Sequence, residues 1–561
     1  MADVACREID EAARARLVAA GCDPRLARLY AARGLTSMDD LATTLQSLVS
    51  PERLTHIDTA ARLLADAIAA GQRMLIVADY DADGATACAV GVRALRSMGA
   101  HVDYIVPNRF EHSYGLSPEI VREAAKRSPD LLITVDNGIA AVEGIAEANR
   151  LGMRVLVTDH HLPGATLPAA ACIVNPNQAG CGFPSKHLAG VGVIFYVMLA
   201  LRAELRRRGA YASTPEPNLA ALLDLVALGT VADVVRLDTN NRILVTQGLA
   251  RIRAGKACAG IAALFHAAGR SMRSATAYDL GFAVGPRLNA AGRLDDMSLG
   301  IACLTCDDPG QAMAMAERLD KLNRERREIE GEMQASALAM LSSVEAGDDY
   351  TLAIHRTEWH QGVVGLLASR LKDRLNRPVF AFATDGARLK GSGRSIAALH
   401  LRDALDLMDK RCPGLIERFG GHAAAAGCTI AADGLDTFRA AFEAVARESL
   451  TVADLAQTIE TDGALEAAQM THDFAQLLRG HVWGQGFPEP RFTGRFRVEA
   501  QKVVGEKHTR LTLGLGGRHF GAIRFGSADA LAESIEAVYR LDLNEYQGDT
   551  TLQLVIEHVT A

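Results

Sequence analysis

From residue 73 onward, short runs of apolar and β-branched residues alternate with longer segments of helical composition. The runs are RMLIVAD (73–79), HVDYIVP (101–107), DLLITVD (130–136), MRVLVTD (153–159) and ACIVNP (171–176). Strands that are hydrophobic at nearly every position and are separated by helices are typical of a parallel sheet covered on both faces. The pattern therefore predicts an α/β fold with a doubly wound parallel sheet.

Beyond this region the pattern changes twice. Residues 308–344 have helical periodicity and dense mixed charge, which predicts a long connecting helix. The runs YTLAIHR, PVFAFAT and ARLKGSGRS predict strands of a second α/β domain, and the alternating runs near the C-terminus predict a small antiparallel barrel of the OB type. We expect an N-terminal helical segment (1–50), a catalytic domain (51–307), the connecting helix (308–344), the second α/β domain (345–450) and the barrel (451–561).

Composition refines this picture without changing it. The chain has 561 residues, a net charge of −7 and 49% hydrophobic residues, as expected for several globular domains. Its longest uncharged apolar run, residues 188–201, is shorter than the roughly 18 residues that span a bilayer, so we expect a buried helix and no membrane association. Ten scattered cysteines and an N-terminus without a continuous apolar segment predict a cytoplasmic protein. The acidic balance excludes a surface coated with nucleic acid but not a local basic groove.

Acids and histidines follow the ends of three predicted strands. They are Asp79, Asp81 and Asp83 in DYDADG, Asp136 in VDNG, and Asp159, His160 and His161 in DHH. The carboxyl ends of parallel strands meet at one edge of a sheet, where ligands bind, so these side chains should converge. A further acid, Asp233, follows a helix that we expect to end near Gly229.

Three carboxylates at alternate positions also resemble the start of a calcium loop of the EF-hand type. That loop needs an acid at its last position, where this chain has Val90, and a preceding helix, where we expect a strand. A second alternative is an acidic cap on a helix that begins near Ala85. Three acids in five residues would repel one another strongly without a cation, and this favours a metal site.

Oxygen-rich ligation with one or two imidazoles suits Mn²⁺ or Mg²⁺, and there are more oxygen ligands than one ion needs. Two ions that share a carboxylate would activate a water and stabilise both oxygens of a displacement at phosphorus. The residues therefore predict hydrolysis of a phosphodiester or a phosphoanhydride.

The motifs DYDADG, VDNG, DHH and VADVV, in this order, resemble the four motifs of the DHH phosphoesterase superfamily. FGGHAAAAG (419–427) resembles the signature of the DHHA1 domain, and with GPRLNAAGRLDD (285–296) the likeness extends over most of the chain after about residue 50. Within the superfamily it is greatest to the bacterial exonucleases that degrade single-stranded DNA from 5′ to 3′. It implies a DHH domain at 51–307, a DHHA1 domain at 345–450, and release of 5′-mononucleotides during DNA repair and recombination.

The resemblance also implies roles for individual residues. Asp81, Asp83, Asp136, His160 and Asp233 would bind two metal ions, with Asp136 as the bridge, while Asp79 would bind or support them and His161 would hold the phosphate or position the water. The residues that would contact DNA are Arg109, Tyr114, Arg287, Asn289, Arg293, Ser392, Arg394 and His422, although each arginine could be an ordinary surface residue and GGH a tight turn. Trp483, Phe487, Phe492 and Phe520 could stack on bases, but we expect more of them in the core.

Family resemblance alone implies the partners, a single-strand-binding protein and a RecQ-type helicase, and a monomeric state. Two kinds of alternative remain. One is another enzyme of the superfamily, a pyrophosphatase, a nanoRNase or a cyclic-dinucleotide phosphodiesterase, for which the barrel would be superfluous. The other is a non-catalytic scaffold that binds single-stranded DNA, which intact motif residues argue against. A nicotinamide-binding fold is disfavoured because DYDADG stands where G-x-G-x-x-G is expected.

Overall fold

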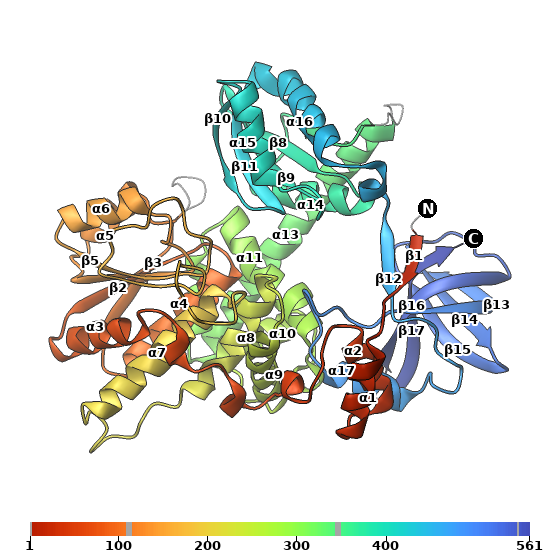
Figure 1. The fold of residues 1–561 in the computed structure, drawn as a ribbon, viewed down its shortest axis with the longest axis horizontal. Coiled ribbons are helices and arrows are strands. Elements are labelled where there is room, and N and C mark those ends of the chain that lie inside the picture. Colours follow the sequence, from red (N-terminus) through yellow and green to blue (C-terminus); the bar gives the residue numbers. More distant parts are fainter. Residues whose placement is uncertain (1–2, 108–114, 343–348, 506, 547–548, 561) are drawn as a thin grey trace. The chain divides into compact units, whose positions relative to one another are not determined.

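The computed structural model describes residues 3–107, 115–342, 349–505, 507–546 and 549–560 (Figure 1). Contacts divide the chain into two compact units. One consists of Asn323–Glu460 with the N-terminal residues up to Ala5, and the other of Cys6–Leu322 with Thr461–Ala561. The C-terminal end of the chain therefore shares a unit with the motif-bearing region. The domain boundaries given above stay a prediction.

A parallel sheet forms the centre of the motif-bearing region. Its strands are β2 (Arg73–Ala78), β3 (His101–Ile105), β4 (Leu131–Val135), β5 (Arg154–Thr158) and β6 (Cys172–Val174), in the order β3-β2-β4-β5-β6. All neighbouring strands are parallel, which confirms the predicted doubly wound sheet. The strand order reverses between β2 and β4, and sheets of this kind bind ligands at the carboxyl ends of the strands beside such a point.

Helices cover both faces of this sheet (Figure 1). Ile76 of β2 shares a core with the helices on one face, and Leu75 and Val77 share another core with those on the opposite face. The helices of the first face are α3 (Ile57–Ala69), α4 (Ala82–Ser97) and α7 (Gly190–Arg207), and those of the second are α5 (Pro118–Ala125) and α6 (Val142–Arg150). As predicted, the run 188–201 lies mainly in a buried helix, α7. No helix in the described ranges is long and apolar enough to cross a bilayer.

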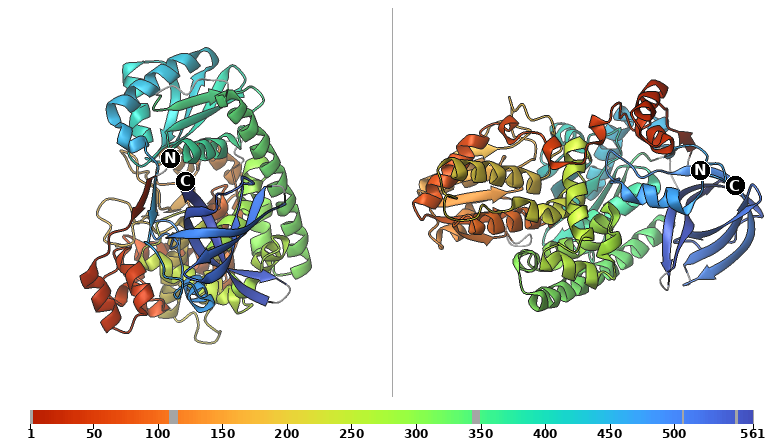
Figure 2. Two further views of the ribbon diagram at one scale, coloured as in Figure 1. Left: turned by 90° about the vertical axis from the view of Figure 1, so that its right-hand side faces the viewer. Right: turned by 90° about the horizontal axis from the view of Figure 1, so that it is seen from below.

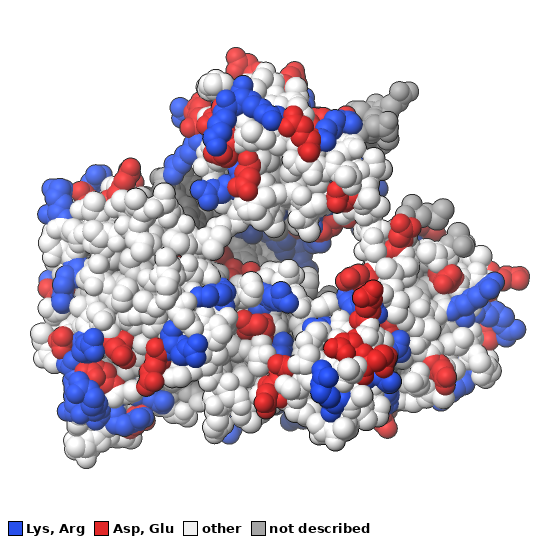
Figure 3. All heavy atoms as spheres, viewed as in Figure 1, with Lys and Arg blue, Asp and Glu red and all other residues white. Residues whose placement is uncertain are grey.

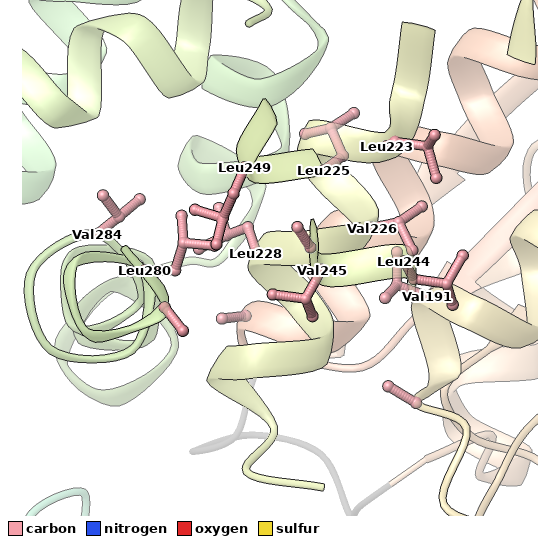
Figure 4. Packing of buried hydrophobic residues seen from close by; sticks show 14 of the residues in the cluster. Val191, Leu223, Leu225, Val226, Leu228, Leu244, Val245, Leu249, Leu280 and Val284 are labelled. Atoms are coloured by element: carbon pink, nitrogen blue, oxygen red, sulfur yellow. The ribbon is translucent and has the colours of Figure 1, made fainter. Parts of the chain in front are cut away.

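A group of helices follows α7 and packs on the same core. Its members are η4 (Leu219–Leu222), α8 (Leu223–Ala232), α9 (Thr239–Arg253), α10 (Ala259–Ala267), η5 (Met272–Ser274), the π-helical η6 (Asp279–Val284), α11 (Gly285–Leu294) and α12 (Ser298–Thr305). Figure 4 shows Leu228 of α8 close to Leu249 of α9 and Leu280 of η6. This packing fixes the end of α8, which carries Asp233.

Two predicted helix ends were wrong by three residues. Helix α8 continues past Gly229 to Ala232, because this glycine serves close packing: a Cβ atom there would lie 2.2 Å from Thr86 Oγ1 and 2.9 Å from Asp83 Oδ1. Helix α4 begins at Ala82, ahead of Ala85, because the Asp81 carboxylate caps it and accepts a hydrogen bond from the Gly84 N–H at 3.0 Å. Asp83 therefore lies in the first turn of a helix.

The long helix α13 (Pro309–Ser342) matches the predicted connecting helix and leads into the smaller unit. There the strands are β7 (Leu352–His355), β8 (Val379–Asp385), β9 (Arg388–Arg394), β10 (Ile416–Gly421) and β11 (Ala425–Ala431), in the order β10-β11-β9-β8-β7. Three helices accompany them: α14 (Val364–Leu375), α15 (Leu401–Arg411) and α16 (Leu435–Ser449). Phe380 of β8 packs edge-on against Phe438 and Phe442 of α16 in the core.

The C-terminal strands close into a barrel in the order β13-β14-β15-β17-β16, which confirms the predicted OB-like architecture (Figure 2). The prediction that the barrel is antiparallel throughout was wrong, because the last strand, β17, pairs in parallel with β15. They are β13 (Phe492–Val504), β14 (His508–Leu515), β15 (Arg518–Arg524), β16 (Ser534–Tyr546) and β17 (Asp549–Thr560), preceded by α17 (His472–Gly480). The N-terminal segment begins with a strand, β1 (Asp3–Cys6), that pairs with β12 (Thr458–Thr461). Two helices follow, α1 (Glu11–Ala19) and α2 (Pro24–Ala31). Three short 3-10 turns come next: η1 (Asp39–Leu41), η2 (Leu45–Ser47) and η3 (Pro51–Arg53). Two further 3-10 turns, η7 (Ala432–Gly434) and η8 (Val452–Leu455), belong to the smaller unit.

The aromatic residues considered for base stacking near the barrel are core residues. Phe487, Phe492 and Phe520 are 3%, 1% and 6% exposed. Trp483 is half-buried, stacks on Phe487 with ring centroids 5.2 Å apart and lies under the Arg33 guanidinium. These side chains tie the N-terminal segment to the barrel.

On the face drawn in Figure 3, basic and acidic side chains are interspersed.

Candidate metal centre

Seven of the predicted site residues gather beside the reversal point of the parallel sheet. They are Asp79, Asp81, Asp83, Asp136, His160, His161 and Asp233. They form three overlapping groups in which the potential ligand atoms lie within 4.8 Å of one another: Asp136, His160 and His161; Asp83, His160 and Asp233; and Asp79, Asp81 and Asp136. Sequence positions from 79 to 233 thus converge on one small volume.

His160 joins these groups. Its Nε2 atom lies 3.1 Å from Asp136 Oδ1, 3.5 Å from Asp233 Oδ2 and 4.0 Å from Asp83 Oδ2. These carboxylates come from the loop after β4, the end of α8 and the first turn of α4. An imidazole nitrogen that faces three carboxylates at this range is an arrangement that a divalent cation would complete.

Asp83 is held at the N-terminus of α7. Its Oδ2 accepts a hydrogen bond from the Gly190 N–H at 2.7 Å, and its Oδ1 accepts one from the Val191 N–H at 2.9 Å. Burial and the neighbouring Asp81 nevertheless raise the pKa of Asp83 to about 7. The helix terminus therefore orients this carboxylate without removing the cost of its charge, which a cation would offset.

Asp136 occupies the most constrained position in the cluster. It has a left-handed backbone conformation, with φ of 62°, and is 2% exposed. The next residue, Asn137, fixes this turn by donating hydrogen bonds to the carbonyls of Val77 and Val135. Helix α7 approaches so closely that a Cβ atom at Gly190 would lie 2.5 Å from Asp136 Oδ1. Strained residues of this kind are found at functional sites.

The cluster passes a simple test of fit to metal ions. Burial and the charges of Asp83 and Asp81 raise the pKa of Asp136 well above its usual range, and burial and Asp83 do the same for Asp233. Among the described residues, no hydrogen bond reaches Asp136 Oδ1 or Asp233 Oδ2, although both atoms are buried. Buried carboxylates that repel one another are suited to a hard divalent cation.

Asp159 was predicted to converge with the other acids, and it contacts both histidines of the cluster. It is 1% exposed, and its Oδ1 accepts hydrogen bonds from the backbone N–H groups of His160 and His161 and lies 2.8 Å from His161 Nδ1. Burial acts to lower the pKa of His161, but the hydrogen bond to Asp159 and nearby charges outweigh it and raise this pKa to about 9. Asp159 thus orients one histidine and favours its charged form. In the sequence, only its position directly after a predicted strand pointed to this place in the site.

Two residues predicted to bind DNA make contacts within the protein. Asn289 Oδ1 accepts a hydrogen bond from the Ala82 N–H at 2.8 Å, so α11 clamps the loop that carries the first acids. Arg287 is 8% exposed and forms an ion pair with Asp320 at 2.7 Å. On the same helix, a Cβ atom at Gly292 would lie 1.9 Å from the Tyr80 carbonyl oxygen. Asn289 and Gly292 therefore position the segment 80–82, which contains Asp81.

The structure describes four of the other six predicted DNA contacts. Arg109 and Tyr114 lie outside the described residues, and Arg293 is half-buried on α11. Ser392, Arg394 and His422 belong to the smaller unit. There Arg394 donates a hydrogen bond to Ser392 Oγ at 3.2 Å, and His422 is exposed in the tight turn between β10 and β11.

Comparison with known proteins places these features in one family. Residues 73–230 match the DHH family N-terminal domain, 348–448 the DHHA1 domain and 461–558 the RecJ OB domain. The chain is 52% identical over 550 residues to the single-stranded-DNA-specific exonuclease RecJ of Dickeya dadantii, covering 95% of each chain. Solved structures of RecJ from Thermus thermophilus in complex with Mn²⁺ and with Mg²⁺ match with TM-scores of 0.82 and 0.77, at 30% and 29% identity. They cover 100% of this chain and 79% and 78% of theirs.

Proposed function

The chain belongs to the RecJ family of single-stranded-DNA-specific exonucleases, and on this premise we propose how it degrades its substrate. It is a metal-dependent nuclease that acts on single-stranded DNA and uses Mn²⁺ or Mg²⁺. We propose that it removes nucleotides from the 5′ end, releases 5′-mononucleotides, and does so with two metal ions bound by the seven-residue cluster. One observation carries this proposal. Five carboxylates that repel one another converge with two imidazoles beside the reversal point of the sheet.

Each residue of the cluster has a distinct part in the proposal. Asp136 would bridge the two ions, since its carboxylate belongs to two of the three ligand groups. Asp81, Asp83, His160 and Asp233 would complete the coordination, with Asp79 binding or supporting it. When bound, the ions would supply Lewis-acid stabilisation of charge on the phosphate and a water of lowered pKa.

The chain itself orients the phosphate. His161 lies with Nδ1 4.0 Å from Asp136 Oδ1, and its raised pKa keeps a positive charge at the edge of the cluster. An imidazolium in this place would donate a hydrogen bond to a non-bridging phosphate oxygen, a charge-assisted contact. Asp159 holds that imidazole through hydrogen bonds to its ring and its backbone N–H. Asp136, His160 and His161 are therefore the residues that we propose to act on the reacting groups.

The alternative functions are not favoured. A pyrophosphatase or dinucleotide phosphodiesterase does not explain the RecJ OB domain at 461–558. A non-catalytic scaffold does not explain why every acid and histidine of the four motifs is present and brought together.

Location, oligomeric state, cellular role, partners and DNA contacts remain part of the proposal. The enzyme would act in the cytoplasm, as a monomer, in DNA repair and recombination. Its partners would be a single-strand-binding protein and a RecQ-type helicase. Arg109, Tyr114, Arg293, Ser392, Arg394 and His422 would contact the strand, whereas the buried ion pair of Arg287 and the backbone contact of Asn289 favour a positioning role for those two.

A time course on end-labelled DNA tests the proposal. Single strands labelled at the 5′ or the 3′ end, and a blunt duplex of the same sequence, are incubated with Mn²⁺, Mg²⁺ or a chelator. We expect immediate release of 5′-labelled mononucleotide, late loss of the 3′ label, a much slower reaction on the duplex and none with chelator. Asp136→Asn should be inactive. Early release of the 3′ label would contradict the polarity, and cleavage with chelator would contradict the metal dependence.

A further inference from the structure

Two stacked aromatic side chains are exposed at η6, the helix that packs on α8. Tyr278 and Phe282 are 48% and 64% exposed, with ring centroids 4.7 Å apart and ring planes inclined by 24°. Among the aromatic side chains that the structure describes, only these two and Phe525 are exposed. A surface that keeps two adjacent rings in water forgoes the stabilisation that burying them would bring, which indicates a binding role.

The helix η6 fixes the direction of the two rings. Tyr278 immediately precedes η6 and Phe282 lies within it, while Leu280 and Val284 on its inner face are fully buried. Figure 4 shows Leu280 directed toward Leu228 of α8, with Val284 on the same helix. Because the inner face is anchored in the core, Tyr278 and Phe282 are held on the outer face. π-Helical turns of this kind are frequent at functional sites.

The same helix packs against the C-terminal end of α8, which Asp233 follows directly. A Cβ atom at Gly281 would lie 3.2 Å from Val231 Cγ1, and one at Gly285, the first residue of α11, would lie 3.1 Å from Ala232 Cβ. The residue after Asp233, Val234, is 62% exposed with a left-handed φ of 62°. The helix that carries the aromatic pair therefore contacts α8 two residues before Asp233, a member of the metal centre.

On its other side the pair meets the barrel. The Arg540 guanidinium of β16 lies 5.9 Å from the centroid of the Tyr278 ring. Glu557 holds that guanidinium at 3.2 Å and Glu489 at 3.4 Å, so Arg540 supports the ring from a fixed position. Tyr278 thus contacts the barrel, while the helix that carries the pair packs against the end of α8, all within one unit of the chain.

We propose that Tyr278 and Phe282 form a platform on which bases of the single-stranded substrate stack between the barrel and the metal centre. Aromatic rings accept any base, because every base has a π-face, and this suits a nuclease that must pass all sequences. The buried aromatics Phe487, Phe492 and Phe520 cannot serve this purpose. The inference rests on the proposed function, since it assumes that single-stranded DNA is the substrate.

The test removes or keeps each ring. Tyr278→Leu and Phe282→Leu remove the rings, whereas the matched variants Tyr278→Phe and Phe282→Tyr keep them. Binding is measured in chelator, by fluorescence anisotropy, with an oligothymidylate of about 20 nucleotides, longer than the roughly 4 to 16 nucleotides that one OB barrel covers. A second strand carries 2-aminopurine at successive positions, because stacking quenches its fluorescence. Hydrolysis of the short substrate pTpT with Mn²⁺ is measured in parallel, and melting temperatures verify folding.

We expect each ring-removing variant to bind the long strand at least about fivefold more weakly and to lose the quenching at one position. The ring-keeping variants should match the wild type in binding, quenching and pTpT hydrolysis. Unchanged binding and quenching in folded Phe282→Leu would overturn the platform. A change in oligomeric state without a change in DNA binding would assign the rings to a protein contact instead. If the wild type itself fails to bind or degrade single strands, the proposed function fails, and this outcome is distinct from the others.

Discussion

The carboxylate of Asp159 lies 2.8 Å from Nδ1 of His161 and accepts the backbone N–H of the same residue at 3.0 Å. One buried acid thus sets both the orientation and the charge of the histidine at the edge of the metal centre. Burial acts to raise the pKa of Asp159, but the contact with His161 outweighs it and lowers that pKa, so the pair is ionic.

Asp159→Asn should weaken catalysis and move its pH dependence. The amide cannot stabilise the imidazolium, so the pKa of His161 falls from about 9 and the charged form is lost at lower pH. We expect kcat/KM to fall about 10- to 100-fold at neutral pH, as for other groups that orient a site residue. The alkaline limb of the pH–rate profile should also begin at a lower pH than in the wild type. An unchanged alkaline limb would show that Asp159 does not control the charge of His161.

Asn289→Ala should weaken metal binding, although the residue was first predicted to contact DNA. Its side chain accepts a hydrogen bond from the Ala82 N–H at the start of α4, between Asp81 and Asp83. Loss of this clamp should reduce Mn²⁺ affinity about 10-fold or more, measured by isothermal titration calorimetry without DNA. If Mn²⁺ affinity is unchanged while affinity for single strands falls, Asn289 is a DNA contact.

Gly292→Ala should disturb the same loop by steric means. The added Cβ would lie 1.9 Å from the Tyr80 carbonyl oxygen, so α11 or the loop must move. We expect lower activity and weaker Mn²⁺ binding, with a reduced melting temperature. Gly331→Ala on α13 is the matched control, because its Cβ meets no described atom within 4 Å and should leave all three quantities unchanged or raise the stability slightly. Equal behaviour of the two variants would refute the close-packing explanation.

These positions show what a sequence can reveal about such a site. Asp79, Asp136 and His160 follow parallel strands, so their convergence was predictable from the alternation of strands and helices alone. Asp233 ends a helix, and only resemblance to the superfamily pointed to it. The N–H group of Gly190 that orients Asp83, and the clamp by Asn289 on Ala82, join segments more than 100 residues apart. No local pattern encodes such contacts, because they depend on how α7 and α11 pack.

Metal-free protein should lose stability as the pH rises from about 4 to 7. The pKa of Asp83 is raised from 3.8 to about 7 in the folded state, so the folded protein holds a proton that the unfolded chain releases. This contribution is complete below pH 3.8 and is lost as the pH passes 7. Mn²⁺ should therefore raise the melting temperature more at pH 8 than at pH 5, and less so in Asp83→Asn. Thermal shift assays with and without Mn²⁺ check this, and a Mn²⁺ effect that is larger at pH 5 would contradict it.

The sharing of Asp136 by two metal ions underlies the whole proposed mechanism, and anomalous diffraction from crystals grown with Mn²⁺ can detect it. We expect two anomalous peaks about 3.5 to 4 Å apart on either side of the Asp136 carboxylate. The ion at the first peak should also be coordinated by Asp79 and Asp81, and the ion at the second by Asp83, His160 and Asp233. A single peak away from Asp136, at Mn²⁺ concentrations that support full activity, would show that this carboxylate bridges no pair of ions.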